Sequence, residues 1–288
     1  MQKLKVFVFS HNRPNAITTS PLLTDENIDH VLLLHNEEQK ANYLQANRVK
    51  PENIVVTNQP RGLSYNRNIA LDMMEDDEWA LFLVDDMKSV TELLNHHKYV
   101  ENFIPIDMDN QNEWKFKFKE PLTLNNFINR AKEMTEFCDS VNSKLGGFCG
   151  IDNPPFRKKH YTFNTFADGR AWVVKKSHLR FDTNVHCIDD YAWNALNLKE
   201  FGITVVNQWV LPDFERYSPG GLGTLQERSE QKIKECAYLV ENYPQYFAYK
   251  EKPGQASLSH ITLRPQRKPD WLTPDQLGKP VDSRGRLA

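Results

Sequence analysis

The sequence has 288 residues, with 36 Lys and Arg against 38 Asp and Glu, so its formal net charge is -2 at pH 7. This length suits one large domain with its own core, and the near-neutral charge excludes a polyanion-binding surface spread over the whole molecule. No apolar run approaches the roughly 18–20 residues of a membrane span, so we expect no membrane association. The four cysteines form no C-x-x-C pair, which favours free thiols in a reducing, cytoplasmic compartment.

Short apolar runs alternate with polar, helix-prone segments along the first third of the chain. The runs cover residues 5–9, 30–35 and 53–57, and the polar segment 37–49 favours a helix. This strand–helix–strand order predicts parallel βαβ units. A further helix is expected from Gly62, and the six apolar residues 79–84 are typical of a central parallel strand that is buried on both faces.

The remaining elements are less regular. Residues 114–119 alternate between aromatic residues and lysine, which predicts an edge strand, and a helix is expected from residue 189 to near Gly202. We therefore predict an α/β domain over residues 1–252, with a mostly parallel central sheet flanked by helices and a small antiparallel element. A basic, proline-rich tail over 253–288 is predicted to wrap the surface or to be partly disordered. Further strands are expected at 146–151, 171–174 and 203–206.

Two adjacent aspartates, Asp85 and Asp86, come directly after the central apolar run. Ligands of open α/β sheets bind beyond the carboxyl ends of the strands, and adjacent carboxylates at such a place need a counter-charge. Mg²⁺ or Mn²⁺ would supply it, taking one or two carboxylates together with diphosphate oxygens. The alternative is a plain turn or helix cap, which aspartate also favours.

Three motifs carry a resemblance to GT-A glycosyltransferases: SHNRP at 10–14, RGLSYNRNIAL at 61–71 and LFLVDDM at 81–87. The resemblance implies a Rossmann-like GT-A sheet that binds a nucleotide-sugar donor and Mn²⁺ or Mg²⁺. The family's usual acidic motif is D-x-D, whereas Met87 follows the two aspartates here. Asp86 is the expected metal ligand, together with Asp85. The residues implied in donor binding are Ser10, His11, Arg13, Arg61, Asn66, Arg67 and Asp85.

A second acidic pair, Asp189 and Asp190, opens a predicted helix and is similar to the late acidic pair of inverting GT-A enzymes. One carboxylate of such a pair removes the proton of the acceptor hydroxyl, and Asp189 is our first choice by a small margin. The alternative is that the helix dipole alone favours acidic residues in the first turn.

A basic and aromatic segment at 156–180 is the candidate nucleic-acid contact, because cations beside stacking rings suit a phosphate backbone with exposed bases. A solvated basic face is the plain alternative. The expected contacts are Arg157, Lys158, Lys159, Arg170, Lys175 and Lys176.

The chain also resembles the TET-associated glycosyltransferases, which include base J glucosyltransferases and phage enzymes that modify DNA. The resemblance rests on the blocks at 61–71 and 81–87, on the compact length and on Gly220-Gly221 after Arg216-Tyr217. It implies a monomeric phage enzyme that moves glucose or arabinose from a UDP-sugar to 5-hydroxymethylcytosine in double-stranded DNA, with the base flipped out. A glycan, lipid or protein acceptor is the first alternative, and a non-catalytic nucleic-acid-binding protein is the second.

Overall fold

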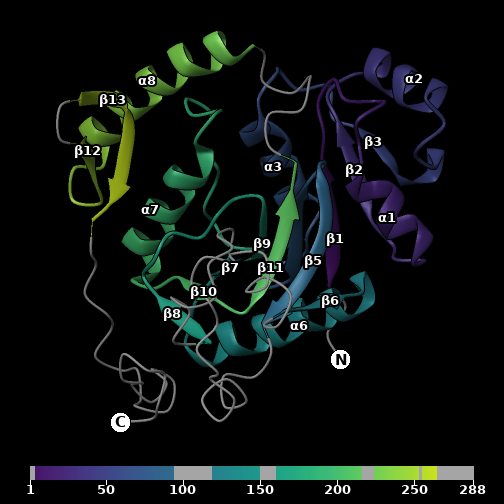
Figure 1. The fold of residues 1–288 in the computed structure, drawn as a ribbon, viewed down its shortest axis with the longest axis horizontal. Helices are drawn as coiled ribbons and strands as arrows, with labels where there is room; N and C mark the ends of the chain where they lie inside the picture. The colour runs from purple at the N-terminus through teal and green to yellow at the C-terminus, as the bar shows by residue number, and fades with distance from the viewer. Residues whose placement is uncertain (1–3, 94–118, 150–159, 216–223, 253–254, 265–288) are drawn as a thin grey trace, which may run out of the picture.

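The computed structural model describes residues 4–93, 119–149, 160–215, 224–252 and 255–264, which form an α/β protein (Figure 1). An eight-stranded sheet has the strand order β3-β2-β1-β4-β9-β7-β10-β8. Its strands are β1 (Lys5–Phe9), β2 (Val31–Leu34), β3 (Ile54–Val56), β4 (Trp79–Val84), β7 (Leu145–Phe148), β8 (Tyr161–Phe163), β9 (Ala171–Lys175) and β10 (Val205–Asn207).

The sheet is mixed, and its two halves differ in direction. Strands β3, β2, β1 and β4 run parallel to one another, which confirms the βαβ prediction for the N-terminal part. Strand β9 is antiparallel to both β4 and β7, and β8 is antiparallel to β10. The prediction of parallel neighbours around β4 is therefore wrong on one side, because an apolar run specifies burial but not strand direction.

Helices cover both faces of the sheet. The alternation along β1 shows why, since Val6 and Val8 belong to the core on one face whereas Phe7 and Phe9 belong to the core on the other. The first face packs against α1, α2 and α6, and the second packs against α3 and α7. Within the described residues the helices are α1 (Thr19–Asp25), α2 (Glu37–Gln45), α3 (Leu63–Asp72), α6 (Leu124–Ser140), α7 (Asp189–Phe201) and α8 (Leu225–Asn242).

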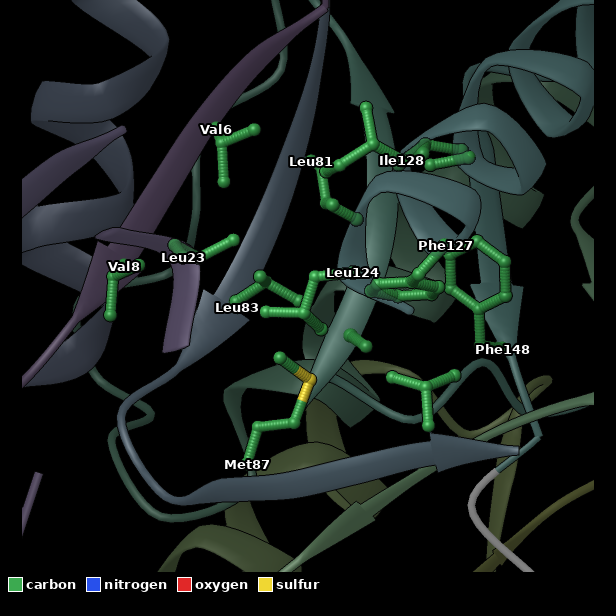
Figure 2. Packing of buried hydrophobic residues seen from close by; sticks show 14 of the residues in the cluster. Val6, Val8, Leu23, Leu81, Leu83, Met87, Leu124, Phe127, Ile128 and Phe148 are labelled. Carbon is green, nitrogen blue, oxygen red and sulfur yellow. The ribbon is translucent and has the colours of Figure 1, made fainter. Parts of the chain in front are cut away.

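Figure 2 shows the larger core from close by, where Leu81 and Leu83 of β4 lie beside Leu124 and Phe127 of α6. Met87 also packs here, because β5 turns across this face directly after the aspartate pair. The chain on both sides of that pair is therefore anchored in the core. Each Å² of apolar surface buried here contributes about 25 cal/mol to stability, so the buried residues on both sides hold the acidic turn in place.

Two small antiparallel sheets complete the fold. One has the order β11-β5-β6, and the other pairs β12 with β13 beside α8. Strand β13 lies inside the segment assigned to the C-terminal tail, whereas residues 114–118 of the predicted edge strand lie outside the described residues. No helix in the described ranges is long and apolar enough to cross a membrane. The strands are β5 (Met87–Leu93), β6 (Lys119–Leu122), β11 (Val210–Phe214), β12 (Phe247–Lys252) and β13 (Gln255–Leu263).

Candidate active site

A cleft of about 190 Å³ lies at the carboxyl ends of β1, β2 and β4. The chain leaves β1 for β2 on one side and places β4 on the other, so the cleft lies at a switch point of the sheet, where open α/β folds bind ligands. Seven residues predicted from the sequence line it together: Ser10, His11, Arg13, Asn66, Asp85, Asp86 and Arg170, the last of which was predicted as a nucleic-acid contact.

The aspartate pair that follows β4 forms an ion pair with a single arginine. Nη1 of Arg13 lies 2.8 Å from Oδ1 of Asp85 and 2.8 Å from Oδ2 of Asp86. Burial raises the pKa of Asp85 to about 6, although Arg13 and a hydrogen bond from Ser10 lower it. Burial likewise raises the pKa of Asp86, against the effect of Arg13. The two carboxylates therefore have a counter-charge from the protein itself.

The acidic turn is held from several sides. The Ser10 hydroxyl donates to Oδ2 of Asp85, and the Tyr43 hydroxyl of α2 accepts the backbone N–H of Arg13 at 2.9 Å. The backbone carbonyl of Asp85 accepts the N–H groups of Thr18 and Thr19, at 2.9 and 3.2 Å. The positions of both carboxylates are thus fixed by the first turn of α1 and by the loop after β1.

The carboxylates of Asp85 and Asp86 suit a divalent cation only when a bound ligand supplies further oxygen atoms. Among the described residues, no group of three His, Cys, Asp or Glu side chains could hold a metal. Asp85 and Asp86 nevertheless lie side by side in the cleft, and Mg²⁺ accepts one or two carboxylates when phosphate oxygens complete its shell. The residues therefore fit a cation that is bound jointly with a diphosphate.

Two histidines form another wall of the cleft. The rings of His11 and His35 meet edge to face, with centroids 4.8 Å apart. Burial, with smaller contributions from His35 and Arg61, lowers the pKa of His11 to about 4, and burial also lowers the pKa of His35. Both rings are therefore neutral at pH 7, so they offer aromatic surface and hydrogen bonds without positive charge.

Helix α3 begins at the cleft, as expected, but its arginines have different roles. Gly62 and Asn66 line the cleft, and Gly62 has φ 150°, with His186 only 2.6 Å from where a Cβ would stand. Arg61 is exposed and is not among the lining residues. Arg67 is buried away from the cleft, although it was predicted to face the donor.

Arg67 instead organises the second acidic pair. Its Nη1 lies 2.6 Å from Oδ2 of Asp189, and its Nη2 donates to the carbonyl of Gly169 at 2.5 Å. The guanidinium also lies 4.6 Å from the Trp172 ring centroid, within cation–π range. Asp189, our first choice as general base, is thus engaged in a buried ion pair at the sheet surface.

Asp190 has the environment expected of a general base. It is half-buried, and burial, together with the charges of Asp189 and Asp168, raises its pKa to about 7. Its Oδ2 accepts the N–H of Gly169 at 3.3 Å, and the next residue, Arg170, lines the cleft. Asp190 is itself outside the lining, so it lies beside the cleft rather than in it.

A buried glutamate that the sequence analysis missed holds the start of α7. Glu235 of α8 accepts three successive backbone N–H groups, from His186 and Cys187 at 2.8 Å and from Ile188 at 3.1 Å. Ile188, the N-cap of α7, makes no side-chain cap, so Glu235 supplies the missing acceptor from another helix. The link is long-range, and no pattern within α8 indicates it.

The predicted nucleic-acid contacts do not form one surface in the described structure. Arg157, Lys158 and Lys159 lie outside the described residues, as does Gly220-Gly221. Arg170 precedes β9 at the cleft. Lys175 is the last residue of that strand and pairs with Trp79 at the start of β4, and Lys176 follows it at this far end.

Each of the three described cations also has partners within the fold. Arg170 forms an ion pair with Asp168 at 2.6 Å, Lys175 forms one with Asp139 at 2.8 Å, and Lys176 donates to the carbonyl of Leu71. Arg170 thus lies at the cleft, whereas the two lysines make contacts at the opposite ends of strands β4 and β9.

Comparisons with known proteins leave the family open. No family model matches the chain, and no curated protein matches it. Among solved structures, mannose-6-phosphate isomerase from Helicobacter pylori aligns over 85% of this chain and 81% of its own, with 10% identity and a TM-score of 0.31. A similarity at that level carries no argument about fold or function.

The cleft also contains residues for which the sequence had a weaker signal. His35 follows β2 just as Ser10 follows β1, so its position at a strand end indicated the same edge of the sheet. Arg228, in the first turns of α8, lines the cleft as well. It lies far along the chain from the other lining residues, and only the packing of α8 brings it there.

Proposed function

We propose that the chain is a GT-A-type glycosyltransferase that uses a nucleotide-sugar donor. The observation that carries the proposal is the cleft at the switch point between β1 and β4, which combines two carboxylates with three arginines. A diphosphate is the ligand class that needs both, since it is an anion that binds arginines directly and carboxylates through a cation. The arginines are Arg13, Arg170 and Arg228.

The start of α3 adds a second source of attraction for the diphosphate. Gly62 and Leu63 line the cleft, and the first N–H groups of a helix lack partners within the helix. An anion at this position also benefits from the helix dipole. The neutral rings of His11 and His35 lie close to this helix start, since His35 Nδ1 is 3.0 Å from the carbonyl of Pro60 and its Nε2 is 3.3 Å from the Asn66 side chain. They would offer the nucleoside aromatic surface without positive charge.

The proposed reaction is a displacement at the anomeric carbon. The acceptor hydroxyl forms the new C–O bond, the bond from the sugar to the diphosphate breaks, and the nucleoside diphosphate leaves. Asp190 takes the proton of the hydroxyl, because a pKa of about 7 matches the work of a general base at neutral pH. We therefore assign the base to Asp190 in place of Asp189, which Arg67 holds in an ion pair.

The cleft residues divide the remaining work. Arg170 faces the charges of both Asp86 and Asp190, so it lies between the proposed leaving-group side and the proposed base. Asp85 and Asp86 would hold Mn²⁺ or Mg²⁺, which supplies charge stabilisation to the departing diphosphate. The residues of the chain thereby bind the donor from one side and deprotonate the acceptor from the other.

For the acceptor we propose 5-hydroxymethylcytosine in double-stranded DNA, with a UDP-sugar as the donor. The support is the resemblance of the motifs at 61–71 and 81–87 to the TET-associated enzymes. Half of the basic residues expected to contact DNA lie outside the described ranges. The proposal for the acceptor therefore depends more on the sequence than the proposal for the donor does.

The test is transfer of label from UDP-[¹⁴C]glucose and UDP-[¹⁴C]arabinose in the presence of Mn²⁺. Hydroxymethylated DNA is compared with unmodified DNA of the same sequence, and Asp86→Asn is compared with Asp72→Asn, which changes an exposed aspartate paired with Arg180. We expect label only in hydroxymethylated DNA and only with the wild type and Asp72→Asn. Donor hydrolysis without labelled DNA would instead favour a glycan, lipid or protein acceptor, and neither binding nor hydrolysis of any donor would contradict the proposal.

A further inference from the structure

Arg13 occupies a position that the proposed chemistry would otherwise give to a cation. One nitrogen of its guanidinium bridges the two carboxylates of the acidic turn, at 2.8 Å from each. The side chain of Arg13 is only 9% exposed, and those of Asp85 and Asp86 are 5% and 12% exposed. The single positive charge of Arg13 therefore offsets part of the charge of the pair in a poorly hydrated place, where opposite charges interact strongly.

A divalent cation and this guanidinium cannot share the carboxylates in this arrangement. Mg²⁺ requires oxygen ligands at about 2.0–2.1 Å, whereas both facing oxygens of the pair already accept from Arg13. The other oxygen of Asp85 accepts from Ser10. Two positive centres a few ångströms apart would repel each other, so a cation that takes both carboxylates requires the guanidinium to leave.

The surroundings of Arg13 allow the side chain to leave while the backbone stays. Its backbone N–H is fixed by the Tyr43 hydroxyl at 2.9 Å, and its carbonyl accepts from Ala16 and Ile17 at 3.1 and 3.0 Å. Arg13 is one of the residues that line the cleft. A diphosphate there would offer it bidentate acceptors that match its geometry better than one nitrogen shared by two carboxylates.

We propose that Arg13 is a resident counter-cation that keeps divalent metal out of the acidic turn until a nucleotide diphosphate draws its guanidinium away. The inference rests on the proposed function for the identity of the ligand, but the competition between Arg13 and a cation can be tested with the metal alone. It assigns the order of binding, with the nucleotide before the metal. It also makes Arg13 a group that opposes one ligand and attracts the other.

The first test measures Mn²⁺ binding at pH 8 without nucleotide, by electron paramagnetic resonance of free Mn²⁺. Wild type is compared with Arg13→Gln and with Arg180→Gln, a control arginine on the surface that pairs with Asp72. Removal of the competing cation should tighten Mn²⁺ binding at least tenfold in Arg13→Gln and leave the control unchanged. Equal Mn²⁺ affinity in wild type and Arg13→Gln, with both proteins folded, would overturn the proposal.

The second test measures UDP binding without metal, by calorimetry on the same three proteins. Loss of a phosphate-binding guanidinium should weaken UDP binding at least tenfold in Arg13→Gln, which is opposite in sign to the effect on Mn²⁺. A merely structural role for Arg13 would weaken both. Tighter Mn²⁺ binding in Arg13→Gln, with no UDP binding by any protein, would contradict the proposed function and leave the competition itself supported.

A third measurement decides the matter if Arg13→Gln does not fold. Mn²⁺ is titrated into wild type with and without saturating UDP. The proposal predicts at least tenfold tighter Mn²⁺ binding with UDP and, by thermodynamic reciprocity, the same factor for UDP in the presence of Mn²⁺. Tight Mn²⁺ binding to wild type without UDP would overturn it.

Discussion

Two of the three Asp-Asp pairs in the sequence lie beside a buried arginine, and they face that arginine in different ways. At the end of β4, Arg13 bridges Asp85 and Asp86 in an open cleft. At the start of α7, Arg67 is 1% exposed and pairs with Asp189, while Asp190 faces further negative charge. Arg13 forms an ion pair with both members of the first pair, whereas Arg67 forms one with Asp189, and the pKa of Asp190 is raised to about 7. The same dipeptide thereby lies in two different electrostatic environments.

The largest expected effect separates the two members of the α7 pair. Asp190→Asn removes the proposed general base, so kcat for sugar transfer should fall by about 10²–10⁴-fold, while the KM for the donor changes little because Asp190 does not line the cleft. Steady-state kinetics at pH 8 measure both constants. A kcat within threefold of the wild type would assign the base elsewhere.

The next effect is on stability and compares the two arginines. Arg67→Met leaves the charge of Asp189 buried without its partner, which should lower the free energy of unfolding by about 3–5 kcal/mol. Urea denaturation followed by circular dichroism measures the change. Arg180→Gln, which breaks an exposed pair with Asp72, should cost less than about 1 kcal/mol. If the two variants lost similar free energies of unfolding, the buried pair of Arg67 and Asp189 would contribute no more to stability than an exposed pair.

A smaller effect is expected from the clamp that α8 places on α7. Glu235→Gln keeps the shape but replaces a charged acceptor of three backbone N–H groups, so the protein should lose about 1–3 kcal/mol of stability. Loss of this negative charge should also lower the apparent pKa of the acidic pair, since Glu235 is among the groups that raise the pKa of Asp189. The pH profile of kcat reports this shift, and an unchanged profile would limit Glu235 to a structural role.

The smallest expected effect is a pH dependence of stability. Asp190 has a pKa of about 7 in the folded protein, above its unfolded value, so the folded state binds more protons and stability falls as the pH rises towards and through 7. Between pH 6 and 8 this carboxyl should contribute a loss of about 1 kcal/mol. Urea titrations of Asp190→Asn should lack that part of the decline. A parallel decline in wild type and variant would place the pKa of Asp190 outside this window.

The sequence predicted the parts of the molecule that depend on local pattern. The apolar runs gave the strands β1, β2, β3, β4 and β9 with their approximate bounds, and Gly202 ends α7 in the left-handed conformation, at φ 71°. Strand direction could not be predicted, because the antiparallel placement of β9 depends on how the chain returns to the sheet.

The candidate site divides in the same way. Residues that directly follow strands, such as Ser10, Asp85 and Asp86, were identified because the carboxyl edge of a sheet is a known ligand site. The roles of Arg67 and Glu235 could not be identified, since each depends on a contact more than 40 residues away along the chain. Nothing in the local sequence distinguishes Asp189 from Asp190, so the choice between them had only a small margin. In the structure the two differ, because Asp189 forms an ion pair with Arg67.

The central claim is that the cleft beyond β1 and β4 binds a nucleotide diphosphate between arginines and carboxylates. A crystal structure of the protein with UDP and Mn²⁺ tests it most directly. The account predicts diphosphate density against Arg13 and the start of α3, with Mn²⁺ between the phosphates and Asp86 and with the Arg13 guanidinium moved off the aspartates. UDP bound at another surface, with Arg13 still bridging Asp85 and Asp86, would contradict it.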